Sequence, residues 1–405
     1  MISEARKQLE EIILPFWLER GPDPRHGGFF TCFDNRGRNL VSTQKFTWSQ
    51  GRFVWLLARA ARLAASGAIA PGTDLIPLAE RGARFLTEHA IRPDGTCHFV
   101  LEADGTPTAG PNGETHSVYA DCFVAMGLCE LATATSSAHW LEAAEPLLRR
   151  ASADIASGRA DTAPYPVPVG WSAFGPRMIL LNTRLEHARA LRQLGRLTPA
   201  ALADLAAARD AMLAHRAADG TFVEMLGETP DDSLIFHHRV PGHALEGVWV
   251  ALETGDLLGK SPDGLLESVS ALCESGWDTE FGGIFRYVDS TGPREPGGSS
   301  GETAYERLVR DTWSTKLWWV HTEAAYTAAL AARRYGDARA GEWAQRIWDY
   351  TIATFPGGHE GAEWIQIRDR AGRPLDQVVA LPVKDPFHIA RNLMQLIELE
   401  AATDA

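Results

Sequence analysis

Cysteine is scarce in this chain of 405 residues. Only five cysteines occur, their number is odd, and no two of them form a C-x-x-C pair. A disulfide framework or a zinc ribbon needs a more regular cysteine spacing, so neither is expected. The sequence therefore predicts free thiols in a reducing compartment.

Long apolar runs are missing too. No stretch of 18 apolar residues occurs, and the N-terminal segment MISEARKQLEEIILPFW is charged and amphipathic, unlike a signal peptide. We expect a cytoplasmic protein with no membrane span. Basic residues are in deficit, because 39 Lys and Arg against 52 Asp and Glu give a net charge of −13. Such a charge repels phosphate backbones, so we expect no nucleic-acid partner.

Motifs for phosphate and metal chemistry are also absent. The chain has neither a G-x-x-x-x-G-K-[ST] phosphate loop nor an H-E-x-x-H zinc motif. We therefore predict no cofactor and no metal.

Helical periodicity dominates what is present. Many segments are rich in Ala and Leu, which lose little side-chain entropy in a helix. The pattern predicts twelve helices, at residues 2–20, 47–66, 73–91, 116–134, 138–156, 175–194, 199–217, 242–257, 262–275, 315–335, 339–354 and 386–401.

Short β segments recur between these helices. Each is an aromatic or β-branched run followed by an Asp-Gly or Asp-x-x-Gly turn, which is typical of a β-hairpin. Four are clear and one is weaker, at residues 27–38, 97–107, 282–293, 364–374 and, more weakly, 219–232.

Helical hairpins alternating with short β excursions indicate a decayed repeat. Twelve helices make six pairs, which suits an all-α (α/α)6 barrel with the β-hairpin excursions at one end of a central cavity. No linker or shift in composition divides the chain, so we expect one catalytic domain over residues 1–405. The segment 292–306 has the loosest composition and is interpreted as a mobile loop.

Two helix starts carry unusual polar residues. Trp48, Arg52 and Trp55 share a helical face, where the guanidinium could present donors to sugar hydroxyls. An arginine that only extends from a core face to solvent would give the same pattern. His243 and Glu246 stand three residues apart at a proline-marked helix start, where a histidine tends to stay neutral. A capping histidine beside a surface glutamate would look alike.

Two later segments have similar features. Trp318, Trp319 and Glu323 open a helix and combine aromatic faces with a carboxylate, whereas His321 faces elsewhere and is interpreted as structural. Lys384, Pro386 and His388 open the last helix, with Arg391 one turn on. Two histidines at the starts of different inner helices could meet across a cavity, but the spacing alone does not establish that they do.

These four segments and a fifth at residues 119–132, in this order, resemble the N-acylglucosamine 2-epimerase family. That family includes mannose isomerases, mannose 2-epimerases and cellobiose 2-epimerases. The match extends over nearly the whole chain. It comprises KFTWSQGR (45–52), YADCFVAMGLCELA (119–132), PGHALEGVW (241–249), KLWWVHTEA (316–324) and PVKDPFHIAR (382–391).

The resemblance implies an (α/α)6 barrel with a sugar pocket, and it implies that His243 and His388 are the acid/base pair. Arg52 would hold the substrate near its reacting carbonyl group. Glu246 and Glu323 would assist the histidines or bind hydroxyls. The other expected substrate-binding residues are Trp48, Tyr119, Asp121, Asn182, Trp318, Trp319 and Lys384.

One departure from the family pattern concerns the substrate. Several isomerases and cellobiose epimerases of the family carry another histidine near the position of Asn182, and the N-acylglucosamine epimerases lack it. His187 is five residues further on and is expected to face away, beside Glu186 on an outer helix surface. The subfamily therefore stays open.

The predicted chemistry is proton transfer at C2 of an open-chain aldose, through an enediolate and without a redox cofactor. We expect a small sugar as the partner, with a mannose-type monosaccharide favoured, and a monomer or homodimer. The alternatives are an N-acyl-hexosamine 2-epimerase, an inverting glycoside hydrolase that uses paired carboxylates (Asp121, Glu246, Asp311 or Glu323), or a non-enzymatic binding module. The sequence does not decide between an epimer and a ketose as product.

Overall fold

Six long helices form the inner layer of the structure. The structure is a computed structural model and describes residues 1–108, 115–227, 232–262, 264–301, 303–357, 363–379 and 381–401. Within these ranges the inner helices are α3 (Thr47–Ala65), α5 (Val118–Thr135), α7 (Phe174–Gln193), α10 (Pro241–Leu258), α13 (Trp318–Tyr335) and α15 (Phe387–Ala401).

A second layer of helices lies outside the first. Five outer helices each follow an inner one in the chain and pack against it, whereas the N-terminal series precedes the first inner helix and packs against the last one, α15. The outer elements are α4 (Ile76–Phe85) with η2 (Leu86–Ala90), α6 (Ala138–Ala156), α8 (Pro199–Leu213), α11 (Leu265–Gly276), α14 (Ala338–Thr354), and the N-terminal series α1 (Ile2–Gln8), η1 (Leu9–Ile13) and α2 (Leu14–Arg20). All twelve helices predicted from the sequence are present.

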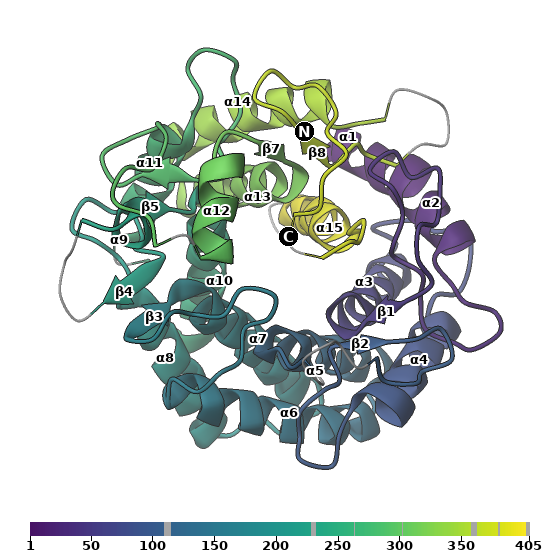
Figure 1. Cartoon of the computed structure of the whole chain (residues 1–405). Helices are drawn as coiled ribbons and strands as arrows, with labels where there is room; N and C mark the ends of the chain where they lie inside the picture. Colours follow the sequence, from purple (N-terminus) through teal and green to yellow (C-terminus); the bar gives the residue numbers. More distant parts are fainter. Residues whose placement is uncertain are drawn as a thin grey trace.

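The inner helices form a closed ring. Each packs against the next one, and the last, α15, packs against both α13 and α3. The sixth pair joins the two ends of the chain, because α15 packs against α1 (Figure 1). The expected (α/α)6 barrel is therefore confirmed.

Four short antiparallel strand pairs stand at one end of the ring. In each pair, one strand directly precedes an inner helix, and its partner comes from the segment after the following outer helix. The pairs are β1 (Lys45–Phe46) with β2 (Val100–Leu101), β3 (Trp171–Ala173) with β4 (Met225–Gly227), β5 (His238–Arg239) with β6 (Val288–Asp289), and β7 (Lys316–Leu317) with β8 (Ile367–Arg368).

Two short helices lie outside the predicted set. They are α9 (Leu234–His237) and α12 (Ala304–Thr312). The expectation of a loop over residues 292–306 is therefore wrong at its end, where α12 begins. Thr303 and Glu306 form a capping box there, in which each side chain accepts from the other residue's backbone N–H, and this stabilises the helix start.

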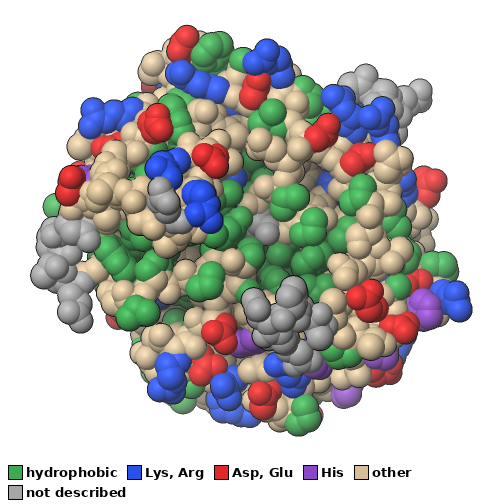
Figure 2. Space-filling model, in the orientation of Figure 1, with side chains coloured by type: hydrophobic (Ala, Val, Ile, Leu, Met, Phe, Trp, Pro, Cys, Tyr) green, Lys and Arg blue, Asp and Glu red, His purple; other side chains and the backbone are tan. Residues whose placement is uncertain are grey.

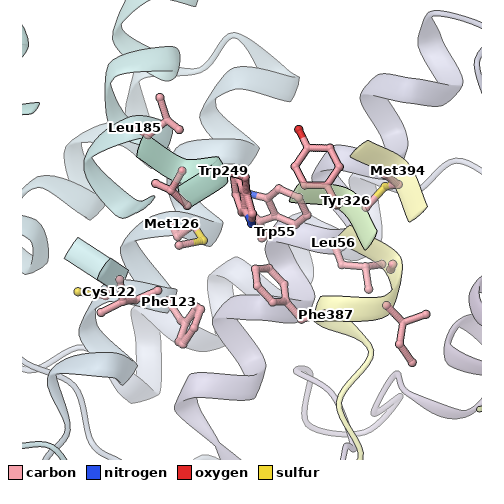
Figure 3. Close-up of a cluster of buried hydrophobic side chains, with 14 of the residues drawn as sticks. Trp55, Leu56, Cys122, Phe123, Met126, Leu185, Trp249, Tyr326, Phe387 and Met394 are labelled. Carbon is pink, nitrogen blue, oxygen red and sulfur yellow. The ribbon is translucent and has the colours of Figure 1, made fainter. Parts of the chain in front are cut away.

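The centre of the ring is filled with apolar side chains. Trp55, Phe123, Trp249 and Phe387 converge from four different inner helices (Figure 3). Helix α5 is long and apolar enough to cross a membrane by length and composition, but 83% of its 18-residue window is buried inside the structure. It is a core helix of the ring. The five cysteines are free and buried.

Candidate active site

A pocket opens at the end of the ring where the strand pairs lie. Its empty volume is about 1340 Å³, which includes the open mouth. In Figure 2, hydrophobic side chains gather in the hollow of this face, and charged side chains lie around it. Concave, mostly apolar sites with a few converging polar groups are typical of small-molecule binding.

All six inner helices contribute to the pocket from their first two turns. The contributing residues are Trp48, Ser49 and Arg52 of α3, Tyr119 and Phe123 of α5, Met178 and Ile179 of α7, His243 and Glu246 of α10, Trp318 and Trp319 of α13, and His388 of α15. Helix N-termini carry partial positive charge, so these helix starts can stabilise negative charge that develops beside them.

His388 is a buried imidazole with a fixed orientation. Its Nδ1 lies 2.7 Å from Oε1 of Glu323. A carboxylate can only accept, so Nδ1 donates and the lone pair is on Nε2. Nε2 in turn lies 3.2 Å from Nη2 of Arg52, which can donate to it. The atom that faces Arg52 is therefore the basic one.

Arg391 links the carboxylates behind His388. Its Nη2 lies 2.5 Å from Glu246 and 2.6 Å from Glu323, and the second oxygen of Glu323 accepts from the indole of Trp249 at 2.7 Å. Glu246, Glu323 and His388 could in principle hold a metal, since their ligand atoms lie within 4.8 Å of one another. The guanidinium of Arg391 already supplies positive charge to both carboxylates.

Arg52 lies among aromatic rings. Its guanidinium carbon is 4.0 Å from the ring centre of Phe123 and 5.0 Å from that of Trp48, and Nη1 donates to Asp385 at 3.1 Å. These contacts fix the fork of donors beside His388. Trp48 also stacks on Tyr119, with ring centres 5.1 Å apart.

His243 faces the same part of the pocket as His388. Its Nδ1 lies 3.1 Å from Oε1 of Glu224. The rings of His243 and His388 lie 5.2 Å and 5.7 Å from the ring of Trp319. The structure therefore brings the two histidines together around one indole, which the sequence spacing left open.

The two histidines have opposite electrostatic environments. Burial, together with the positive charges of Arg52 and Arg391, lowers the pKa of His388 from 6.5 to about 3. Burial also disfavours charge on His243, but the attraction of Glu224 and its hydrogen bond outweigh burial and raise the pKa of His243. Opposite shifts in a pair of titratable groups mark them as candidates for base and acid.

Three expected substrate-binding residues lie outside the pocket lining. Asp121 accepts from the backbone N–H of Cys97 and contacts His116 at 2.8 Å. Lys384 is buried, and its Nζ lies 2.6 Å from Glu363. Asn182 is buried one turn below Met178. The three side chains therefore do not line the pocket in this structure, and a role for them in substrate binding stays a prediction.

The expectation that Glu186 and His187 lie on an outer helix surface is also wrong. Glu186 and His187 are buried rather than on an outer surface, because α7 is an inner helix covered by α6 and α8. Glu186 is held by Arg189 at 2.8 Å. His321 is buried as well, and it accepts from the backbone N–H of Ile284 at 2.9 Å.

Several pocket residues were not singled out from the sequence. Those that do not belong to the inner helices come from segments between the helices or from α12. The polar ones among these are Thr162, Tyr165, Glu224, Arg286, Tyr287, Tyr305 and Asp385. For Glu224 a signal was present: Phe222 and Glu224 lie two apart in the weak fifth β segment, and both are buried. A glutamate on the buried face of a strand needs a partner.

A ring of helix pairs with two histidine–carboxylate pairs in its pocket defines an enzyme of proton-transfer chemistry. The N-acylglucosamine 2-epimerase (GlcNAc 2-epimerase) family model matches residues 28–391. The chain is 30% identical to the N-acylglucosamine 2-epimerase of Rattus norvegicus over 95% of this chain and 88% of that protein.

Solved structures agree in fold. Cellobiose 2-epimerase from Bacillus thermoamylovorans superposes with a TM-score of 0.78 at 18% identity, covering 98% of each chain. A D-mannose isomerase gives 0.73 at 16% identity, again covering 98% of each chain. The chain belongs to the N-acylglucosamine 2-epimerase family and is a sugar 2-epimerase or isomerase.

Proposed function

We propose that this enzyme epimerises a free aldose at C2, with His388 and His243 acting on opposite faces of the sugar. The observation that carries this proposal is the placement of two histidines, with opposite pKa shifts, around Trp319 in one pocket.

His388 is suited to remove the C2 proton. Its neutral ring carries the lone pair on Nε2, and Glu323 holds the Nδ1 proton at 2.7 Å. Removal of the proton leaves an enolate, or an enediolate where C2 carries a hydroxyl group, whose negative charge develops on the carbonyl oxygen at C1. Arg52 lies beside Nε2 and can donate to that oxygen, and the inner helix N-termini add positive potential.

His243 is suited to return a proton at C2 from the other face. The C–H bond broken on one face is then replaced by a C–H bond on the other, so the product is the 2-epimer. Return of the proton to C1 would give a ketose instead. The enzyme ends the turnover with His388 protonated and His243 neutral, and exchange with solvent restores the starting state.

An N-acylated hexosamine is the substrate class we favour, ahead of the mannose-type sugar preferred from the sequence. The pocket wall next to Glu224 is apolar, with Ala173 paired to Met225 across the β3–β4 strands and Met178 nearby on α7. An acyl methyl group on C2 would contact this wall, whereas a hydroxyl would be desolvated there. The relationship to the rat N-acylglucosamine 2-epimerase supports this choice.

The hydrolase alternative fits the carboxylates less well. Glu246 and Glu323 both bind Arg391, Asp385 binds Arg52, and Asp121 and Asp311 lie outside the pocket lining. Acidic side chains held in this way lack the free general acid that glycoside hydrolysis needs.

Isotope exchange tests the reaction and the substrate together. N-acetylglucosamine, N-acetylmannosamine, mannose, glucose and cellobiose would each be incubated with the enzyme in D2O and followed by NMR. We expect deuterium at C2 of an epimeric N-acylhexosamine. Deuterium at C1 of a ketose would instead identify an isomerase, and release of a monosaccharide from cellobiose would identify a hydrolase.

Histidine variants test the mechanism. We expect His243→Asn and His388→Asn each to lower kcat at least ~100-fold, because each removes a proton-transfer group, with circular dichroism unchanged. His139→Asn, on the exposed face of α6, is the control and should keep full activity. Normal turnover by the folded His388 variant would contradict the mechanism and would favour the hydrolase.

A further inference from the structure

The pocket contains two histidine–carboxylate pairs that differ in what surrounds the carboxylate. In the first pair, His388 contacts Glu323 at 2.7 Å. In the second, His243 contacts Glu224 at 3.1 Å. Both carboxylates are buried, and each accepts from the Nδ1 side of its histidine.

The charge of Glu323 is shared with a cation. Nη2 of Arg391 lies 2.6 Å from Oε1 of Glu323, the oxygen that also contacts His388. Trp249 donates to the other oxygen at 2.7 Å. The carboxylate can therefore orient His388, but little of its negative charge remains to stabilise a positive imidazolium.

The charge of Glu224 is directed to histidine alone. Among the described residues, no lysine or arginine forms an ion pair with it, and His243 is its hydrogen-bonding partner. The nearby His238 and His215 are buried, and burial lowers the pKa of each, so both stay uncharged near neutral pH. The residue is fixed by its backbone, because its carbonyl accepts from the N–H of Phe174 at 2.8 Å, the first residue of α7.

The other charged groups that face His243 do not reverse this balance. Glu246, on the same helix, is bound to Arg391 at 2.5 Å. Arg286 approaches from the segment before β6, but its guanidinium donates to Thr312 and to the carbonyl of Val379. From α13 the neighbour is the uncharged indole of Trp319, with the neutral ring of His388 on the same indole.

We infer that Glu224 is a positioning residue that keeps His243 protonated in the free enzyme, which prepares it for the direction of epimerisation in which His388 is the base and His243 is the acid. This inference rests on the proposed function. It assigns a role to a residue that does not touch the reacting atoms and acts through His243. The unequal treatment of the two carboxylates, one shared with Arg391 and one not, decides which histidine carries the proton.

The arrangement favours one starting state of the free enzyme, and the reverse reaction starts from the state with the proton on His388. If both histidines were neutral, no acid would be available for the second face. If both were protonated, no base would be available for the C2 proton. The negative charge of Glu224 acts on His243, whereas the charge of Glu323 is balanced by Arg391. This difference favours the state in which His243 is protonated and His388 is neutral.

The test compares Glu224→Gln with the wild-type enzyme. Glutamine preserves the shape and an acceptor but removes the charge. Activity requires protonated His243, so kcat/KM falls as pH rises through the pKa of His243. We expect the alkaline limb of the kcat/KM profile to move down by about one pH unit or more in the variant, and Glu224→Asp to restore most of it. Activity below pH 6 should change much less than activity at pH 8.

Glu145→Gln is the matched control. Glu145 of α6 lies 3.9 Å from His187, a histidine–carboxylate pair outside the pocket, and its loss should leave the pH profile unchanged. A uniform loss of activity for Glu224→Gln at every pH, with the alkaline limb in place, would show a merely structural role and would overturn the inference.

A second measurement needs no substrate and is made on the wild-type enzyme, with one variant used only for assignment. NMR titration of the histidine Cε1–H signals in the wild-type enzyme, with the His243 signal assigned by its loss in His243→Asn, gives the protonation of His243 directly. We expect it to titrate above pH 6.5. Titration below that value would overturn the inference while leaving the proposed epimerisation to be judged by the D2O experiment.

Discussion

Arg52 combines two features that a lysine cannot reproduce. Its planar guanidinium lies against Phe123 and Trp48 and presents donors toward both Asp385 and His388. A lysine would keep the charge but would place a single ammonium group on a flexible stem. The position of the donor, rather than the charge alone, decides how well the enolate oxygen at C1 is stabilised.

We therefore predict that Arg52→Lys lowers kcat by ~100-fold or more, about 3 kcal/mol of transition-state stabilisation, with a smaller effect on KM. Steady-state kinetics on the active sugar measures both constants. Arg346→Lys is the control, since Arg346 also lies over a tryptophan, Trp343 of α14, but on the exposed surface. An Arg52 variant whose loss appeared only in KM would place Arg52 in ground-state binding instead.

Residue roles could be predicted from the sequence only where a motif marked them. His243, His388, Arg52 and Trp319 lie in motifs at helix starts, and the structure places all four at the pocket. Asp121 and Lys384 lie in equally clear motifs, yet their side chains turn into buried contacts. A motif gives the position in the chain but not which face of the helix start meets the cavity. Glu224 lies in no motif. Its importance comes from its contact with His243, which is 19 residues further along the sequence.

At the scale of elements, each strand pair fixes the start of an inner helix. The first backbone N–H of α7 donates to Glu224, and that of α13 donates to Gln366. The start of each helix is thereby tied to a segment from the next repeat. Periodicity predicted the helices well because each one has a buried face, but it could not predict which strands pair, since the partners are about 50 residues apart.

Close packing at the start of α7 gives a prediction for this element. A Cβ atom at Gly175 would clash with the hydroxyl of Tyr119, whose ring stacks on Trp48. We predict that Gly175→Ala displaces Tyr119, raises KM several-fold and destabilises the protein, because the extra methyl group overpacks the site by about 1–3 kcal/mol.

Gly341→Ala on α14 is the matched control for that prediction. A Cβ atom there would meet only the Cβ of Ala332, at 3.5 Å. Alanine is the better helix former, so the free energy of unfolding should rise by about 0.5–1 kcal/mol with unchanged kinetics. Urea unfolding and steady-state kinetics on both variants provide the measurement, and equal effects of the two substitutions would refute the packing argument.

At the scale of the whole molecule, the ring joins the two ends of the chain. Helix α1 packs against α15, so the helix pair that closes the ring is made from both ends of the chain. Neither end can form this pair without the other. We propose on this basis that residues 1–405 form one catalytic domain. Such closure also explains why the sequence has no linker, because every segment between helices must return the chain to the ring.

Buried neutral histidines make the stability of this ring dependent on pH. Burial lowers the pKa of His321 to about 3, and burial with two arginine charges lowers that of His388 equally far. Between pH 6.5 and 3 the unfolded chain takes up protons at these sites and the folded protein does not. The stability that these two histidines contribute is therefore fully present above pH 6.5 and is lost as pH falls toward 3. Glu130 acts in the opposite sense, because burial raises its pKa to about 7 and the folded protein takes up its proton first.

The contribution of one histidine can be isolated with His321→Asn. The variant should be less stable than the wild type at pH 7, because the backbone N–H of Ile284 loses its acceptor. On acidification from pH 7 to 5 it should lose about 2 kcal/mol less of its free energy of unfolding than the wild type does, since it no longer carries the histidine that must stay neutral. Urea titrations at the two pH values measure this difference, and the exposed His139→Asn should show the wild-type dependence. An identical pH dependence for His321→Asn and the wild type would mean that His321 takes up its proton in the folded ring.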